Sequence, residues 1–367
     1  MKPKLNSAVS VVRVNEKILE FFKSNTRQQV RIKVDSDLIL KIVCDLDGDK
    51  DIREIAEKYN VSEAELVGLF SFLAQKGILN AVDPAIDFKE YEKFRRVINF
   101  LGDFSTSHEH LVKMWNDLQS ACVLIVGLGA VGSWVACNLS QSGIKKFILM
   151  DPDAVEKSNL HRQFGYTETD IGVKKIDVLE KRLKEYNPNV CVKKSYDFLD
   201  GEVLSRFDGD HIDLIINCAD KPTVDMTSTW IGEYAMKRQI PHIVGGGYNL
   251  HLSLVGQTII PGQTACVKCF EKTLEEENKI DRSRVKKLAV KNRKVGSFGP
   301  MCSLIASMIG MEAIKILSKC CRPANINRRG EFDIYSMDVS YKEYNKRLDC
   351  DWCGVNGLYS DAKYPRE

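Results

Sequence analysis

The sequence predicts an α/β protein in which a parallel, doubly wound sheet follows a small N-terminal α+β unit. Between about residues 120 and 220, short apolar runs alternate with segments of helical periodicity, the pattern of a sheet with helices on both faces. Before it, strand-like runs and two helical segments indicate a separate unit over residues 1–85. Two pairs of closely spaced cysteines predict a metal site within residues 86–367.

Composition limits the class of protein. The chain has 367 residues, of which 44% are hydrophobic and 28% charged, and its net charge is +3; these values are ordinary for a globular protein of two or three domains. The charge is too small to indicate nucleic-acid binding, no apolar run reaches the length of a membrane span, and the N-terminus lacks a signal-peptide core. We therefore expect a cytoplasmic protein with no nucleic-acid or membrane partner.

Residues 1–85 are predicted to contain two strands followed by two helices. The runs VSVVRV and QQVRIKV alternate like half-buried strands, and DIREIAEKYN forms a short amphipathic helix. A second helix begins with a capping box of Ser62 and Glu65 and closes at Gly77, before the predicted linker NAVDPAIDF. This order is typical of a winged-helix-like domain, but the acidic Glu63 and Glu65 on the second helix disfavour DNA binding.

The segment CVLIVGLGAVGSWVACNL runs an apolar strand into a glycine-rich turn and then a helix. Gly127, Gly129 and Gly132 meet the pattern G-x-G-x-x-G of a Rossmann-like nucleotide fold, in which the helix N-terminus offers free N–H groups to a phosphate. The next strand ends at Asp151, whose carboxylate is expected to reach ribose hydroxyls. This pattern predicts a nucleotide without distinguishing NAD from ATP, and a glycine-rich turn without a ligand is the plainer alternative.

The run after Asp151 favours ATP. It supplies a dense set of polar and charged side chains: Asp153, Asn159, Arg162, Gln163 and Lys175. A triphosphate needs cations because negative charge grows on its leaving pyrophosphate, whereas a nicotinamide cofactor has no such need. A nicotinamide oxidoreductase is therefore a remote alternative.

The string D-x-D-x-V-x-x-S-N-L-x-R-Q, followed by D-x-G-x-x-K, resembles the ubiquitin-activating superfamily in its ThiF/MoeB/MccB branch, over about residues 90–355. The resemblance implies that the chain adenylates a carboxylate with Mg-ATP. It implies that Asp151 holds the ribose, that Asn159 and Arg162 contact the phosphates, and that Lys175 neutralises them. The segment NCADKPTVD resembles the part of the family that supplies a magnesium-associated aspartate, here Asp220.

The resemblance also implies a homodimer in which an arginine of each subunit reaches the ATP of its partner. The nearest match is KFRRV, which places Arg96 in that role, although lysine and valine replace two residues of the family pattern. Relatives that pass the acyl group to a thiol carry a cysteine in a crossover segment, here about residues 270–296, and this chain has none there. Cys302 follows it in an apolar helix and is predicted to be core, so the adenylate is expected to meet a nucleophile directly.

The motifs CVKC and CDWC supply four cysteines, Cys266, Cys269, Cys350 and Cys353. Two such pairs that meet in space form a tetrahedral sulfur site whose usual occupant is zinc, and many relatives carry one pair in each half. Four thiolates leave no position open for water, so a structural role is predicted. A redox C-x-x-C motif and plain buried cysteines are the alternatives.

The segment LDGDKDIREIAEKYNVSEAELVGLFSFLAQKGIL resembles PqqD-like domains, which recognise precursor peptides by binding a leader as an added strand. Arg27, Arg31 and Lys33 are then candidate contacts for an acidic leader. A domain that only stabilises the dimer is the plainer alternative.

Microcin-type and pantocin-type maturation enzymes share this layout. The sequence thus predicts ATP-dependent adenylation of a carboxylate in a ribosomally made precursor peptide, with release of AMP and pyrophosphate and formation of a ring or an amide in antibiotic biosynthesis. One alternative is adenylation of a ubiquitin-like sulfur carrier that ends in Gly-Gly. A second is a peptide-binding scaffold with a decayed nucleotide site, against which the intact Asn159, Arg162, Lys175 and Asp220 argue.

Overall fold

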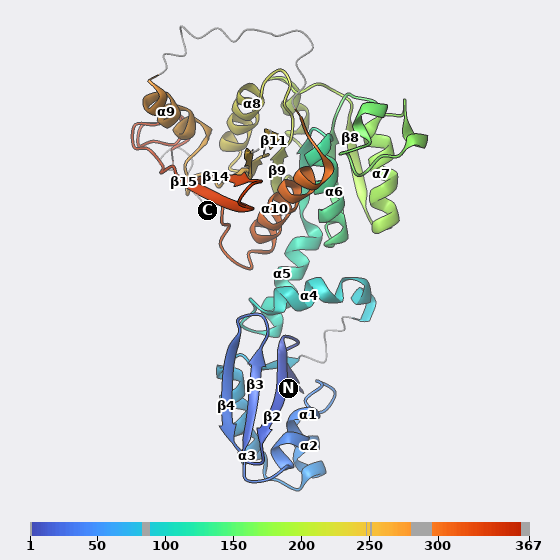
Figure 1. The fold of residues 1–367 in the computed structure, drawn as a ribbon, viewed down its shortest axis with the longest axis vertical. Coiled ribbons are helices and arrows are strands. Elements are labelled where there is room, and N and C mark those ends of the chain that lie inside the picture. Colours follow the sequence, from blue (N-terminus) through green and yellow to red (C-terminus); the bar gives the residue numbers. More distant parts are fainter. Residues whose placement is uncertain (1, 83–88, 247, 250–251, 280–295, 361–367) are drawn as a thin grey trace. The chain divides into compact units, whose positions relative to one another are not determined.

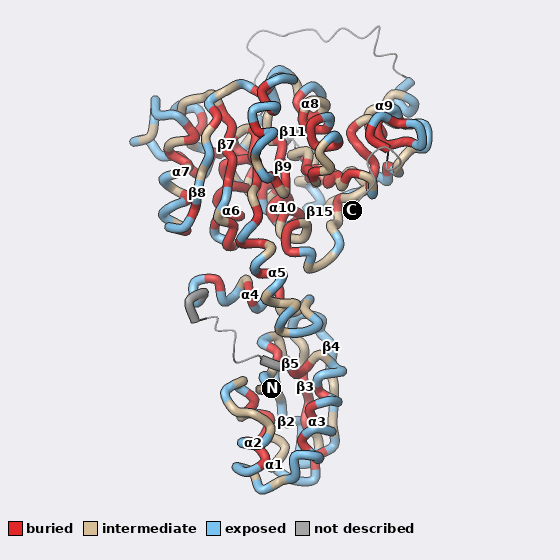
Figure 2. The backbone as a smooth tube through the Cα atoms, turned by 180° about the vertical axis from the view of Figure 1, so that it is seen from behind, coloured by how far each residue is buried: buried red, intermediate tan, exposed pale blue. Residues whose placement is uncertain are grey.

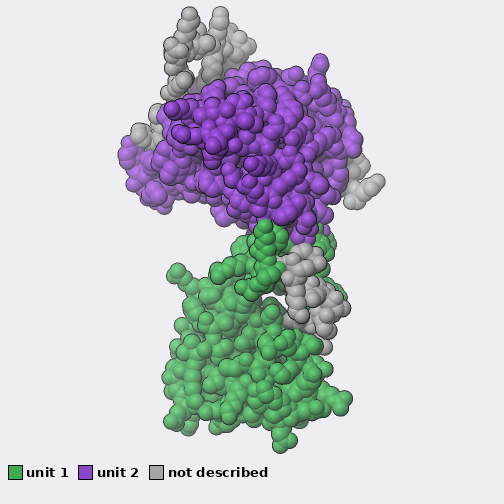
Figure 3. Space-filling view, turned by 90° about the vertical axis from the view of Figure 1, so that its right-hand side faces the viewer, with its two compact units in different colours: residues 1–116 green, residues 117–367 purple. Residues whose placement is uncertain are grey.

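A computed structural model describes residues 2–82, 89–246, 248–249, 252–279 and 296–360 of the chain. The chain forms two compact units, residues 1–116 and 117–367, which Figure 3 colours separately. The first carries the predicted peptide-recognition elements, and the second carries the glycine-rich turn and the four cysteines.

A three-stranded antiparallel sheet, in the order β2-β3-β4, frames the first unit (Figure 1). Its strands are β2 (Val9–Asn15), β3 (Ile18–Lys23) and β4 (Gln28–Lys33), and its helices are α1 (Leu38–Cys44), α2 (Ile52–Tyr59) and α3 (Glu63–Gln75). Leu19 and Phe21 of β3 are buried in the core that these helices complete. The predicted capping box is confirmed, because Ser62 and Glu65 each accept a backbone N–H of the other, and Gly77 has a φ of +64° just beyond the helix.

Sequence alone does not predict all of this unit. The middle of β3 (Leu19, Glu20, Phe21) is buried on both faces, so it lacks the alternation that marks a half-buried strand. The predicted linker begins too early, because β5 (Leu79–Val82) pairs antiparallel with β1 (Lys2–Leu5). The rest of that linker, residues 83–88, lies outside the described residues. A 3₁₀ turn (Lys89–Phe94), α4 (Arg95–Gly102) and α5 (His108–Ser120) follow.

The second unit contains the predicted doubly wound sheet, in the order β13-β10-β9-β6-β7-β8. Five strands are parallel, and β13 joins antiparallel at the edge beside β10. The strands are β6 (Cys122–Val126), β7 (Lys146–Met150), β8 (Cys191–Ser195), β9 (Leu214–Asn217), β10 (His242–Val244) and β13 (Gln257–Ile259). The helices that accompany them are α6 (Ala130–Gln141), α7 (Lys175–Tyr186) and α8 (Val224–Lys237).

The core of this unit lies on both faces of the central strands (Figure 2). Leu124 and Val126 of β6 pack with Ile231 and Ala235 of α8 in one apolar cluster. The helix α6, which packs against β6, is in turn contacted by α7 and by α10 (Gly299–Ser318). Because the strands are parallel, the segments after β6, β7, β8 and β9 meet at one edge of the sheet, where ligands of open α/β sheets bind.

The helix α10 is, among the described residues, the one helix long and apolar enough to cross a membrane by length and composition, contrary to the expectation from sequence. Of its most apolar stretch, 56% is buried within the protein, and the helix packs along α6, as a core helix does. The remaining elements are α9 (Val267–Asn278) and a four-stranded antiparallel sheet of β11 (Tyr248–Asn249), β12 (Leu252–Leu254), β14 (Arg328–Asp333) and β15 (Asp338–Glu343).

Candidate nucleotide site and four-cysteine site

The fold itself requires glycine at two positions of the glycine-rich turn. Gly127 has a φ of +88°, and a Cβ there would lie 2.7 Å from the backbone carbonyl of Cys218, at the end of β9. A Cβ at Gly132 would lie only 1.9 Å from the carbonyl oxygen of Gly127. Larger residues at these two positions would therefore push the turn away from β9 or α6 away from the turn.

Gly129 differs from its two neighbours in the motif. The nearest atom to a Cβ at Gly129 would be Gln163 Nε2, at 3.9 Å, so packing within the chain does not exclude a side chain here. Gly129 is also the N-cap of α6, and among the described residues no side chain caps the first turn of that helix. The free N–H groups and the open space together suit a phosphate, which supplies acceptor oxygens and needs close approach to the backbone.

Asp151 ties the end of β7 to this turn. Its Oδ2 accepts the Leu128 N–H at 2.6 Å and its Oδ1 accepts the Asp153 N–H at 2.8 Å, interactions that sequence does not reveal. The residue is 5% exposed, and burial raises the pKa of Asp151, although the nearby Lys175 opposes that rise. A carboxylate has about four acceptor positions, so both oxygens keep capacity for a ribose hydroxyl.

Arg162 and Gln163 each have a buried polar atom without a hydrogen-bond partner in the described part of the chain. Arg162 Nη1 donates to the Ser158 carbonyl at 2.7 Å, but Arg162 Nε is buried and has no hydrogen-bond partner among the described residues. Gln163 is 4% exposed, and its Oε1 likewise has none there. A buried unpaired polar group costs about 1–3 kcal/mol, so a ligand that pairs with these atoms would recover that energy.

Asn159 has a structural task beside its predicted one. Its Oδ1 accepts the Glu156 N–H at 3.0 Å and so holds the 3₁₀ turn Lys157–Asn159 that precedes Arg162. The buried Asn159 therefore positions Arg162, and its predicted contact with a phosphate stays a prediction.

Lys175 and Asp153 form an ion pair at the start of α7, with Lys175 Nζ 3.1 Å from Asp153 Oδ2. The Lys175 side chain is 6% exposed, so this cation is fixed in place. A second lysine that the sequence reasoning does not single out, Lys221, lies 3.9 Å from the same oxygen and is 70% exposed. Its position directly after Asp220, in the segment beyond β9, is the signal that could have drawn attention to it.

The other predicted residues fall in two places. Asp220 is exposed in the segment after β9, at the same edge of the sheet, and its predicted magnesium role stays a prediction. Arg96 is exposed on α4, in the first unit, and its predicted action on a partner's ATP stays one too. In the first unit Arg27 and Lys33 are exposed, whereas Arg31 Nε contacts Glu20 Oε2 at 2.6 Å.

The two C-x-x-C pairs meet as predicted. The four sulfur atoms lie within 4.8 Å of one another and all four residues are buried. Cys266 Sγ is 3.5 Å from Cys350 Sγ, and Cys269 Sγ is 3.3 Å from Cys353 Sγ. A zinc ion with four Zn–S bonds of about 2.3 Å requires sulfur separations of about 3.8 Å, so this set fits zinc with small adjustments. Cys302 is buried in α10, as the sequence predicts.

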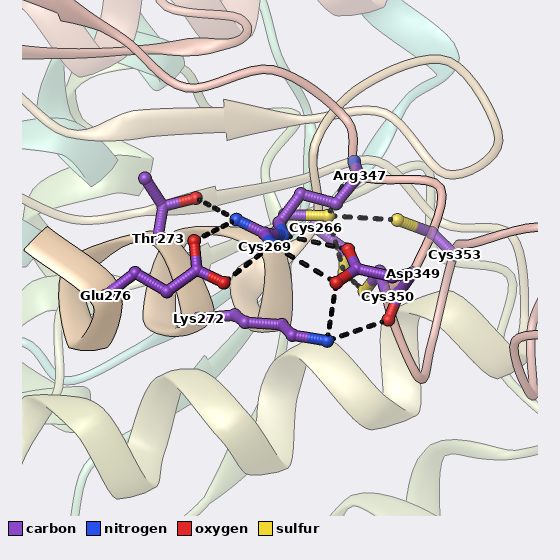
Figure 4. A network of polar contacts seen from close by, with 9 residues as sticks. All are labelled: Cys266, Cys269, Lys272, Thr273, Glu276, Arg347, Asp349, Cys350 and Cys353. Atoms are coloured by element: carbon purple, nitrogen blue, oxygen red, sulfur yellow. Dashed lines mark hydrogen bonds and ion pairs between the residues drawn. The ribbon is translucent and has the colours of Figure 1, made fainter. Parts of the chain in front are cut away.

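A polar network lies beside these cysteines (Figure 4). Arg347 bonds both oxygens of Glu276 on α9 at 2.7 Å and both oxygens of Asp349, at 2.9 and 3.1 Å. The Lys272 ammonium lies 2.8 Å from Asp349 as well, and the Arg347 N–H points to Cys269 Sγ at 3.5 Å. The network thus joins the helix that carries the first cysteine pair to the loop that carries the second.

A profile of the ThiF family matches residues 106–354, which include both sites. The chain belongs to the ThiF family. The molybdopterin-synthase adenylyltransferase of Escherichia coli K12 is 27% identical over 240 residues, which cover 65% of this chain and 88% of that protein. The ubiquitin-like modifier-activating enzyme 5 of Drosophila grimshawi is 28% identical over 219 residues, or 57% of this chain, and the match spans about half of that protein, 53%.

Solved structures extend the likeness of fold to more than nine tenths of the chain. Escherichia coli MccB, solved with AMPCPP and MccA, superposes with a TM-score of 0.73 at 22% identity over 96% of this chain and 100% of that chain. PaaA superposes with a TM-score of 0.72 at 20% identity over 93% of this chain and 99% of that chain. At these identities the likeness to MccB and PaaA shows the fold, and the predicted resemblance to the ThiF/MoeB/MccB branch is confirmed.

Proposed function

We propose that this ThiF-family chain is an ATP-dependent adenylyltransferase that activates a carboxylate of a ribosomally made precursor peptide. The observation that carries the adenylation is the combination at the glycine-rich turn. The uncapped start of α6 lies at Gly129, the buried Gln163 is next to it, and Arg162 keeps an unpaired buried nitrogen. These groups fit a phosphate chain, and no contact within the described residues accounts for them.

The reaction follows from these positions. An oxygen of the substrate carboxylate, already ionised at pH 7, attacks the α-phosphorus, the bond from that phosphorus to pyrophosphate breaks, and an acyl adenylate forms. The adenylate later gives AMP when a nucleophile of the peptide or a small molecule takes the acyl group. In this assignment Asp151 accepts from the ribose, and Arg162 and Lys175 stabilise the growing charge on pyrophosphate.

A magnesium ion, which the family's reaction uses to screen the triphosphate, would be held by Asp220. Asp220 suits this task because an exposed carboxylate at the carboxyl edge of the sheet offers the oxygen ligands that magnesium prefers. Zinc is the proposed occupant of the four-cysteine site. Its role would be structural, since four sulfur ligands leave no open position.

The peptide substrate is supported by the first unit. The match to the molybdopterin-synthase adenylyltransferase covers 65% of the chain, whereas the likeness to MccB, solved with MccA, covers 96%. In the first unit β2 and β4 are the edges of the three-stranded sheet, so a leader can add as a further strand. The exposed Arg27 and Lys33 would attract an acidic leader, and Arg31 would do so only by giving up Glu20.

Three further proposals complete this function. The winged-helix-like unit of residues 1–85 binds the leader, while residues 86–367 carry the chemistry. The enzyme is a cytoplasmic homodimer, in which Arg96 reaches the partner's ATP. The product belongs to antibiotic or related natural-product maturation, as the resemblance to microcin-type and pantocin-type enzymes implies.

The experiment begins with a randomised displayed-peptide library selected for binding to the full chain. Each selected peptide is then incubated with the protein and Mg-ATP, and the nucleotide products are separated. We expect AMP and pyrophosphate in amounts that depend on the peptide. Formation of ADP and phosphate, or no consumption of ATP with any selected peptide, would contradict the proposal. Replacing both Arg27 and Lys33 with Ala should weaken peptide binding while leaving the binding of AMPCPP unchanged.

A sulfur carrier is the second candidate substrate, favoured by the match to the molybdopterin-synthase adenylyltransferase, which covers 65% of this chain. It predicts that a small ubiquitin-like protein ending in Gly-Gly is adenylated at its C-terminus. It also predicts that the Arg27 and Lys33 substitutions leave this activity intact, because the N-terminal unit has no part in it. The same product assay with such a protein separates the two candidates.

A further inference from the structure

We infer that Lys221 is a catalytic residue of this chain, which contacts the β- and γ-phosphates of bound ATP and stabilises the leaving pyrophosphate. The inference rests on the proposed function, and it adds a third cation to Arg162 and Lys175. Neither the sequence motif nor the ion pair between Lys175 and Asp153 requires a lysine at this position.

The backbone places Lys221 beside the glycine-rich turn. A Cβ at Gly127 would lie 2.7 Å from the Cys218 carbonyl and 2.8 Å from the Ala219 nitrogen, so the segment after β9 lies directly against the turn. Ala219 is held there by two hydrogen bonds, from its N–H to Asn217 Oδ1 at 3.1 Å and from Thr227 Oγ1 to its carbonyl at 2.9 Å. Lys221 is two residues further along this anchored segment.

The contact with Asp153 shows which way the Lys221 side chain extends. In the sheet β6 lies between β9 and β7, so the segment that carries Lys221 and the segment that carries Asp153 lie on opposite sides of the turn after β6. Lys221 Nζ is nevertheless 3.9 Å from Asp153 Oδ2. The side chain therefore reaches across the carboxyl end of β6, where the glycine-rich turn would hold the phosphates.

The two lysines on Asp153 differ in how firmly they are held. Lys175 Nζ is 3.1 Å from the carboxylate and its side chain is 6% exposed, whereas the Lys221 side chain is 70% exposed at 3.9 Å. An exposed ion pair contributes about 0–1 kcal/mol, so Lys221 can leave Asp153 at little cost. A triphosphate carries more negative charge than one carboxylate, and it would draw this ammonium away from Asp153.

The three cations would then lie on both sides of the phosphates of bound ATP. Arg162 and Lys175 come from the segment after β7, and Lys221 comes from the segment after β9. Charge that develops on the leaving pyrophosphate would thus meet cations from both sides of the turn. Preorganised charge of this kind stabilises a transition state more than it stabilises the ground state.

Comparing the binding of AMPCPP and AMP tests this role, because AMP lacks the two phosphates that Lys221 would contact. We would measure, by calorimetry on the full chain with magnesium, the affinity of AMPCPP and of AMP. The variants are Lys221→Met, Lys221→Arg and the control Lys193→Met. Lys193 is the matched control, since it is an exposed lysine on a strand of the same sheet that pairs with a single aspartate, Asp210, at 2.6 Å.

In Lys221→Met we expect the Kd of AMPCPP to rise about tenfold or more, while that of AMP changes less than about twofold. Lys221→Arg should recover most of the loss, and Lys193→Met should match the wild type. An unchanged AMPCPP affinity in Lys221→Met, or an equal loss for AMP and AMPCPP, would overturn the inference. A wild-type protein that does not bind AMPCPP would instead contradict the proposed function itself.

Discussion

The nucleotide site and the four-cysteine site lie in the same unit and are built in opposite ways. At the glycine-rich turn, α6 begins without a side-chain cap, and Arg162 and Gln163 keep buried atoms without partners among the described residues. At the cysteines, Arg347 bonds two carboxylates, and each sulfur lies close to another. The first arrangement leaves capacity for a ligand that binds and dissociates, and the second is compatible with a structural zinc ion.

The largest effect on binding and stability is expected from removing one sulfur ligand of the four-cysteine site. Cys266→Ser should abolish tight zinc binding and lower the thermal midpoint sharply, because binding energy at a structural zinc site is folding energy. Metal analysis and calorimetric melting measure both effects. Cys44→Ser, which changes an exposed free cysteine, should change neither. Full zinc content in Cys266→Ser would contradict the assignment of the site.

The second largest effect is expected from acid, which should lower the folding stability of the core beside the cysteines. His242 on β10 is fully buried, its strand partner Ile259 belongs to the cluster that holds the cysteines, and burial lowers the pKa of His242 from 6.5 to about 4. Between pH 6.5 and 4 the unfolded chain therefore binds more protons than the folded one, so stability falls as the pH falls through this window. This lowering of the pKa from 6.5 to about 4 corresponds to about 3 kcal/mol.

The His242→Leu variant isolates this contribution. Urea unfolding of the wild type and of His242→Leu at pH 7 and pH 4.5 gives the difference between the two proteins at each pH, which removes effects of acid on other groups. The variant should lose less stability than the wild type on acidification. Equal losses in the two proteins would show that His242 does not titrate in this window.

A smaller effect is expected from a substitution in the polar network beside the cysteines. Arg347→Met removes the contacts to Glu276 and Asp349 while keeping all four sulfur ligands, so zinc affinity should fall about 10–100-fold. Competition with a chromogenic chelator measures that affinity. Arg206→Met, which removes an exposed arginine paired with Asp197 at 2.8 Å, should have wild-type affinity. If Arg347→Met also binds zinc as the wild type does, the network has no part in forming the site.

Features encoded in short spacing could be predicted from the sequence. The three glycines, the capping box at Ser62 and the two cysteine pairs each depend on residues within a few positions of one another, and the local backbone fixes their geometry. The strand β3 could not be predicted by alternation, because Glu20 is buried together with its apolar neighbours.

Contacts between distant segments could not be predicted in the same way. The approach of Lys221 to Asp153 depends on the order of strands in the sheet, which places the segments after β9 and β7 on either side of one turn. The sequence assigns Asp151 to a ribose, but the bonds of Asp151 to the Leu128 and Asp153 N–H groups form only when β7 and the turn after β6 are brought together. Spacing in the sequence carries no signal for such pairs.

In the proposed function, ATP is cleaved between its α- and β-phosphates at the site around Arg162. Exchange of labelled pyrophosphate into ATP, in the presence of a selected peptide, tests it directly because only a reversible adenylation gives exchange. We predict peptide-dependent exchange by the wild type and a rate about 100–1,000-fold lower in Arg162→Ala. The control Arg182→Ala removes a half-buried arginine that pairs with Glu185 on α7, and its rate should match the wild type. Absence of exchange in the wild type, or an undiminished rate in Arg162→Ala, would contradict this account.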